Sequence, residues 1–297
     1  MSATTEAEPA PRVGTGTRVA AALSRWWFTP VPRARIAAFR VLIYAFLPLD
    51  VLVLRPWGAA HGYVDADLYR PLLIGRVLPL PTPTPTLVHL VQYGAVGLSA
   101  AIVVLIAMNR APRVQTWLGA GIFLLYLEWM LVSFSYGKVD HDRFAFLVAL
   151  AVLPTAGRAA LRDMAPSPSA GWALRMVQVG VVATYFLAAI AKVRYGGWAW
   201  ANSTTIARAV IRRGTMLADP LLQLPWTLQL SQWFILTLEF ASPALLFMRQ
   251  KFQQYAVAFL VSFHVVTFLM IRIIFMPHVV CLAAFLPLER ILNRKTA

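Results

Sequence analysis

The sequence is poor in charged side chains and in cysteine. Only 13% of its 297 residues are charged, whereas 59% are hydrophobic, and the mean hydropathy is +0.66. An average soluble domain carries about 25% charged residues, so this composition excludes an ordinary water-soluble globule. The single cysteine, Cys281, lies in an apolar run and excludes a disulfide framework, a thiol redox pair and a cysteine-ligated metal site built by this chain alone.

The motifs of several enzyme classes are also missing. No G-x-x-x-x-G-K-[ST], G-x-G-x-x-G or G-x-S-x-G sequence occurs, so nucleotide-driven transport, dinucleotide binding and serine hydrolysis have no support. No H-x-x-H or H-E-x-x-H spacing places two histidines on one helix face. We therefore expect no metal site.

Basic residues outnumber acidic residues, 27 against 12. They lie between the apolar runs and form no aromatic-interleaved patch, so a nucleic-acid partner is not expected. If the N-terminus is inside, most of them fall in the inner segments, as the positive-inside rule requires. The distribution predicts a multi-pass membrane protein with both termini in the cytoplasm. The membrane is expected to be the bacterial inner membrane.

The apolar runs predict an all-α membrane protein, a polytopic bundle of about eight transmembrane helices, because lipid leaves no backbone polar group unpaired. The runs are 36–54, 87–108, 114–134, 143–157, 173–191, 228–248, 254–271 and 274–290. Residues 1–32 are expected to form a disordered cytoplasmic tail, residues 33–292 the transmembrane domain, and residues 293–297 a cytoplasmic C-terminal tail.

The outer segment 194–227 is too long and too patterned for a simple connector. It places Trp198 and Trp200 before a run in which apolar residues alternate with Arg208, Arg212 and Arg213. This arrangement predicts an amphipathic helix that lies in the membrane interface.

Ionisable side chains inside the apolar runs mark candidate sites, because each is costly in hydrocarbon unless it faces a cavity or a partner. Lys192 ends an apolar helix, where desolvation favours the neutral amine, a usable base. Alternatively, Lys192 anchors the helix end at the interface. His141, between two aspartates, is either a proton relay or a solvated loop histidine.

Three further groups lie deeper in the runs. His264 either belongs to a site or hydrogen-bonds a neighbouring helix. Glu128 and Glu239 are structural donors, proton carriers, or ion-pair partners of Arg272 or Lys192.

Residues 185–193 read Y-F-L-A-A-I-A-K-V and are followed by Trp198. This stretch resembles the Y-F-x-A-G-x-x-K-L…W segment of the vitamin K-dependent gamma-carboxylases and of the wider horizontally transferred transmembrane (HTTM) family, with Ala189 in place of the family glycine. The segment E-F-A-S-P-A-L-L-F at 239–247, then Phe263-His264 and residues 275–277, are similar to later family helices in the same order. The resemblance covers most of residues 33–290.

The resemblance implies carboxylase-like chemistry that depends on a reduced quinone of the vitamin K or menaquinol type. Lys192 would be the base that deprotonates the quinol, and His141 would stabilise developing oxyanion charge. His264, Tyr185, Trp198 and Glu239 would bind the cofactor. The expected partners are membrane lipid and a secreted peptide substrate.

Two alternatives do not require an enzyme. In the first alternative, the chain is a membrane factor for maturation or export of a secreted peptide. This alternative predicts that Lys192 and His141 lie apart. A small-solute transporter instead predicts a polar path through the membrane along Glu128 and Glu239.

Overall fold

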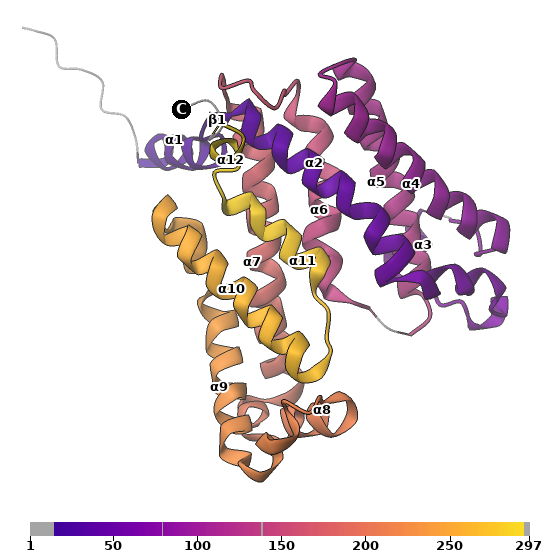
Figure 1. Ribbon diagram of the computed structural model, residues 1–297, viewed down its shortest axis with the longest axis vertical. Coiled ribbons are helices and arrows are strands. Elements are labelled where there is room, and N and C mark those ends of the chain that lie inside the picture. The colour runs from indigo at the N-terminus through magenta and orange to yellow at the C-terminus, as the bar shows by residue number, and fades with distance from the viewer. Residues whose placement is uncertain (1–14, 79, 138, 294–297) are drawn as a thin grey trace, which may run out of the picture.

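Figure 1 shows the computed structural model of the chain, an elongated bundle of long helices. The structure describes residues 15–78, 80–137 and 139–293. Within these residues, six helical segments are long and apolar enough to cross a membrane. They span Arg33–Leu54, Pro85–Ala107, Pro112–Phe134, Pro168–Gly196, Pro225–Phe247 and Gln250–Ile271. The chain is therefore an all-α, multi-pass membrane protein.

The first span joins α2 (Arg33–Leu49) to a π-helical turn (Asp50–Leu54), and α4 (Pro85–Ala107) and α5 (Pro112–Phe134) follow as a hairpin. The longest helix is α7 (Pro168–Gly196). The fifth span is α9 (Pro225–Ala241) with the 3₁₀ turn Ser242–Phe247, and the sixth is α10 (Gln250–Ile271).

Proline begins four of these helices, because its fixed φ and missing N–H suit the first helical turn. Side-chain caps fix two of the starts. The Thr84 hydroxyl accepts a hydrogen bond from the Leu87 amide at 3.2 Å, and Ser167 accepts one from the Ala170 amide at 3.3 Å.

Two of the eight predicted spans are short helices in the structure. The run 143–157 forms α6 (Phe144–Val152) and the 3₁₀ turn Leu153–Ala156, and the run 274–290 forms α11 (Met276–Cys281) and the 3₁₀ turn Leu282–Phe285. Proline limits each helix, Pro154 after α6 and Pro277 at the start of α11. The two helices pack against each other inside the bundle (Figure 1).

The structure describes the N-terminal segment from residue 15, within the range 1–32 expected to form a disordered cytoplasmic tail; residues 1–14 lie outside the described residues. Helix α1 (Thr15–Trp27) contacts the bundle through Trp26, which stacks on Phe247 at 5.9 Å. The Arg175 guanidinium lies 4.5 Å from the Trp26 ring. These aromatic contacts supply the packing that the composition of the tail does not predict.

A two-residue ribbon anchors the same end of the bundle. Strand β1 (Val31–Pro32) pairs antiparallel with β2 (Pro166–Ser167). The C-terminal helix α12 (Glu289–Asn293) is joined to α2 by two hydrogen bonds from Arg35 to Glu289, at 2.7 and 2.8 Å. Figure 1 places α1, β1 and α12 together, opposite α8 (Thr205–Arg213). We name these the terminal end and the α8 end.

Candidate functional site

A cavity of about 200 Å³ lies between α7, α9, α10 and α11, towards the α8 end. We call it the histidine pocket. Its ionisable and hydroxyl-bearing walls include His141, Thr184, Tyr185, Lys192, Glu239, His264, Thr267 and His278. Aromatic rings of Trp200, Phe263 and Phe275 complete the lining. The structure thus brings five of the six predicted site residues to one cavity.

Lys192 of α7 and Glu239 of α9 form an ion pair in this pocket. The Lys192 Nζ lies 2.6 and 2.7 Å from the two carboxylate oxygens, and the two side chains are 23% and 10% exposed. The ammonium also lies 5.4 Å from the centre of the Trp200 ring. Lys192 is therefore held inside the bundle by a carboxylate and an aromatic face, and it does not extend into water as an interfacial anchor.

Arg272 is not the partner of either membrane acid. It is exposed, follows α10 in a left-handed conformation (φ +54°), and forms no ion pair within the residues that the structure describes. Among the alternatives open for Glu239, the structure selects pairing with Lys192. Glu128 lies on α5, is half-buried, and does not line the histidine pocket.

Three aromatic side chains form the deep wall. The Tyr185 hydroxyl and the His264 Nε2 are 2.7 Å apart, and the His278 ring lies 4.5 Å from the Tyr185 ring and 5.6 Å from the His264 ring. His278 is 1% exposed. His278 is not among the site residues predicted from the sequence, because nothing local indicates that the chain turns its ring toward Tyr185 after Pro277.

Some nitrogens of this wall lack a partner. Neither ring nitrogen of His278, nor the Nδ1 of His264, has a hydrogen-bond partner among the described residues. Buried polar groups are satisfied in nearly all native structures. Such nitrogens beside a cavity indicate that a polar group of a ligand, or water, completes their hydrogen bonding.

His141 lies at the mouth of the pocket, in the short 3₁₀ turn His141–Arg143 before α6. Its ring is exposed and 6.4 Å from the ring of Phe275. Lys192 and His141 therefore line one cavity, although they are 51 positions apart in the chain.

Trp198 is placed differently from the expectation. Its side chain is 65% exposed, stacks on Phe240 at 6.2 Å, and does not line the histidine pocket. Trp200 lines the pocket instead. The 3₁₀ turn Trp198–Asn202, which follows Gly197 at φ +63°, points the two indoles in different directions.

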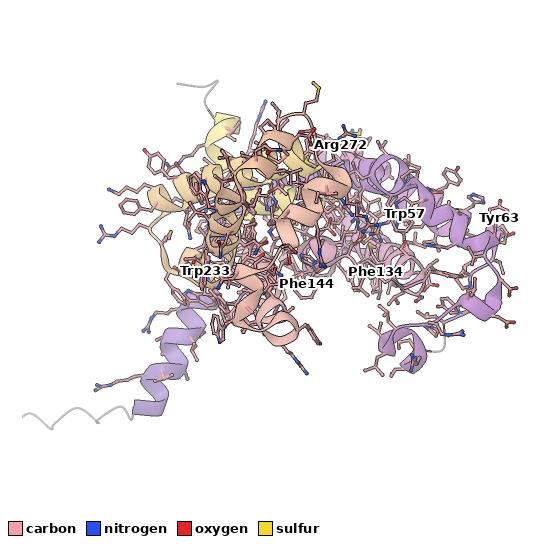
Figure 2. All side chains as sticks on the ribbon, turned by 90° about the horizontal axis from the view of Figure 1, so that it is seen from below. Trp57, Tyr63, Phe134, Phe144, Trp233 and Arg272 are labelled. Atoms are coloured by element: carbon pink, nitrogen blue, oxygen red, sulfur yellow. The ribbon has the colours of Figure 1, made fainter. Side chains whose placement is uncertain are left out.

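Two larger apolar cavities adjoin the histidine pocket. One, of about 530 Å³, shares His141, Thr184, Ala188 and Lys192 with it, and the other, of about 360 Å³, shares His264, Ile273 and Phe275. Phe134 and Phe144, labelled in Figure 2, line the larger one. Both are bounded by helices that are long and apolar enough to span a membrane, so the polar pocket adjoins hydrocarbon-lined space.

A buried charge network holds the segment that carries His141. The fully buried Asp50 carboxylate pairs with Arg143 at 2.9 Å and accepts a hydrogen bond from the Tyr126 hydroxyl at 2.7 Å. Arg143 also contacts Asp142 at 3.1 Å. Burial raises the pKa of the Asp142 carboxyl, and the neighbouring Arg143 acts in the opposite direction.

Arg55 forms the second part of this network. It pairs with Asp140 and lies 4.7 Å above the ring of Trp57. Asp50, Asp140 and Asp142 are not among the site residues predicted from the sequence. Their partners are distant in sequence, and no spacing rule joins them.

Within the described residues, no group of three or more histidine, cysteine, aspartate or glutamate side chains is placed to hold a metal ion. No protein-family model, curated protein or solved structure matches the chain. A proposal for the function of this chain therefore depends on the geometry of the site, because no matching protein supplies one.

Proposed function

We propose that the chain is a multi-pass membrane enzyme that oxidises a lipid-soluble hydroquinone with molecular oxygen as the electron acceptor, with Lys192 as the base. One observation carries the proposal. An ion-paired amine, a tyrosine–histidine pair and a fully buried histidine without partners line one cavity that adjoins hydrocarbon-lined space. The motif resemblance to the vitamin K-dependent gamma-carboxylases supports the same chemistry.

A reduced quinone fits the residues of the histidine pocket. Its ring would lie between Trp200, Phe263 and Phe275, while the free nitrogens of His264 and His278 would hydrogen-bond its oxygens. Its apolar chain would leave through the adjoining cavity of about 360 Å³. When bound, the quinol supplies the reducing electrons, and the chain supplies binding, orientation and proton transfer.

The Lys192–Glu239 pair provides a route for the proton. In a dry pocket, transfer of one proton from the ammonium to the carboxylate removes two separated charges and leaves a neutral amine. That amine can then accept the proton of a bound hydroxyl group, and the Trp200 face stabilises the ammonium that results. His141, at the mouth, donates a hydrogen bond to developing negative charge.

The same proposal places the α8 end outside the cytoplasm and both termini inside, in a bacterial inner membrane. The quinol would then reach the pocket from the lipid side, and a peptide substrate would approach from water. The basic inner segments support this orientation.

The test is oxidation of reduced menaquinone by the purified full chain, followed as oxygen consumption. Lys192→Met is expected to lower the rate by at least about 100-fold, the scale of general base catalysis. Lys251→Met is the matched control, because Lys251 is an exposed lysine at the other end of the bundle, and it should retain the wild-type rate. Full activity of Lys192→Met would refute the assignment of the base.

Lipid analysis tests the binding step separately. Mass spectrometry of lipids that co-purify with the wild-type protein should find a quinone, and His278→Phe should reduce its amount, because the ring nitrogens are lost while the aromatic volume is kept. Equal quinone content in both proteins would contradict the role of His278.

No specific observation favours either of the two alternative functions, a maturation factor or a transporter. A maturation factor without catalysis predicts that Lys192 and His141 lie apart, whereas both line the histidine pocket. A transporter predicts a polar path along Glu128 and Glu239, and Glu128 is not among the residues of that pocket.

A further inference from the structure

A fourth cavity, of about 670 Å³, opens at the α8 end and is also lined by His141. We call it the arginine cleft. Six arginines line it: Arg55, Arg143, Arg208, Arg212, Arg213 and Arg272. Figure 2 looks onto this end of the bundle and labels Arg272 and Trp57, which both belong to the cleft.

The two walls of the arginine cleft differ in charge balance. On one wall, Arg55 pairs with Asp140, and Arg143 pairs with Asp50 and Asp142. On the other wall, the three arginines of α8 and Arg272 form no ion pair within the part of the chain that the structure describes. This wall therefore carries unbalanced positive charge into the cleft, which favours an anion.

Guanidinium groups select the type of anion. Each presents a planar fork of N–H donors that matches two oxygens of a phosphate group, and several such forks around one cleft suit a phosphate better than a single-point anion. The cleft also has few acidic side chains to exclude it, because Asp140 and Asp142 are already paired.

The surroundings indicate that the phosphate belongs to a lipid. Helix α8 turns Val210 into the bundle, while Ile211, Met216 and Leu217, next to its arginines, are exposed. Exposed apolar residues beside basic ones are typical of a segment that lies at lipid headgroup level. Trp198 and Trp226, also exposed at this end, fit the aromatic belt of a membrane interface.

The arginine cleft adjoins an apolar cavity. It shares Val139, Asp140, His141 and Arg143 with the apolar cavity of about 530 Å³. An amphiphilic molecule with its anionic group on the arginines would therefore have its chain beside this cavity. The cavity of about 360 Å³, which would hold the quinone chain, also adjoins the cleft, through Leu54, Ile273, Ile274 and Phe275.

We propose that the arginine cleft binds the phosphate group of an anionic phospholipid whose acyl chain enters the adjoining apolar cavity of about 530 Å³. The bound lipid covers the mouth of the histidine pocket at His141 and limits access of water to it. This binding does not require the proposed quinol chemistry, and it can be tested without an activity assay.

The experiment measures lipid binding to the delipidated full chain in detergent by native mass spectrometry. The probes are phosphatidylglycerol and phosphatidylcholine with identical acyl chains. Phosphatidylglycerol is expected to bind the wild type at least about tenfold more tightly, and added salt should weaken that preference. Arg208→Gln/Arg212→Gln should remove the preference.

The matched control is Arg76→Gln/Arg194→Gln, which removes the same charge from exposed arginines outside the cleft. It should keep the wild-type preference to within about twofold. If circular dichroism shows that the cleft variant has lost helix, the single variant Arg272→Gln is used, with a smaller loss of preference expected in the same direction.

Three results would overturn the proposal. They are equal affinity for the two lipids, an unchanged preference in the folded cleft variants, and an equal loss of preference in the control. Displacement of phosphatidylglycerol by inorganic phosphate at equal concentration would show that the site recognises free phosphate and would reject the lipid as its ligand.

Discussion

At the residue scale, the Lys192–Glu239 pair determines the chemistry available to the protein. Each charge alone is costly in a membrane bundle, and together they form two short hydrogen bonds. Removal of one partner leaves the other charge unpaired in a poorly hydrated site. For buried pairs, removal of one partner lowers the free energy of unfolding by about 3–5 kcal/mol. The lower end of this range applies here because the Lys192 side chain is 23% exposed.

This predicts a specific order of stabilities. Lys192→Met should lower the midpoint of thermal unfolding in detergent more than the double variant Lys192→Met/Glu239→Gln, because the double variant contains no unpaired carboxylate. The coupling energy of the cycle should be at least about 1 kcal/mol. Lys251→Met serves as the control and should unfold like the wild type. Additive effects of the two substitutions would mean that the pair does not form.

Most of the pocket residues could be found from sequence for one reason. Ionisable groups are rare in apolar runs, so Lys192, Glu239 and His264 stand out without any structural information. Trp198 and Trp200 could not be distinguished, because the direction of each indole depends on the 3₁₀ turn that Gly197 permits. The Asp50–Arg143 pair could not be predicted either, since it joins the end of the first span to the start of α6.

At the element scale, helix ends explain where span prediction succeeds and where it does not. Long apolar runs with proline at the first turn, as in α4 and α5, form full-length spans. Hydropathy alone does not separate these from the runs 143–157 and 274–290, which contain proline and continue as 3₁₀ turns. These two short helices pack inside the bundle, and α11 then brings His278 to the pocket.

The N-terminal segment packs closely against α7 at Gly171. A Cβ at Gly171 would lie 1.9 Å from the backbone oxygen of Thr29, whereas a Cβ at Gly97, in the exposed part of α4, would meet nothing within 4 Å. Gly171→Ala should therefore destabilise the protein by about 1–3 kcal/mol through overpacking. Gly97→Ala should be neutral or stabilise by up to about 1 kcal/mol, because alanine favours helix.

Thermal unfolding of the two alanine variants in the same detergent checks this prediction. Limited proteolysis adds a local readout, since Gly171→Ala should increase cleavage between α1 and β1, where Thr29 has to move. An identical unfolding midpoint for the two variants would show that the N-terminal segment does not pack on α7 as described.

At the scale of the whole molecule, the cavities lie towards one of the two ends of the bundle. Helix α1, the β1–β2 ribbon and α12 lie at one end, and α8 lies at the other (Figure 1). The histidine pocket, the arginine cleft and the two apolar cavities share lining residues and therefore lie next to one another towards the α8 end. The orientation of the molecule in the membrane decides from which side a polar substrate reaches this region.

Helix α7 supplies a direct test of that orientation. Its 29 residues span about 43 Å at 1.5 Å per residue, enough to place Ala165 and Ala199 on opposite sides of the membrane. Both alanines are exposed, and the native Cys281 is buried, so Ala165→Cys and Ala199→Cys form a matched pair in a Cys281→Ala background. The basic inner segments predict that a membrane-impermeant thiol reagent labels Ala199→Cys in intact cells. Ala165→Cys should react only after permeabilisation, and the reverse pattern would place the histidine pocket on the cytoplasmic side.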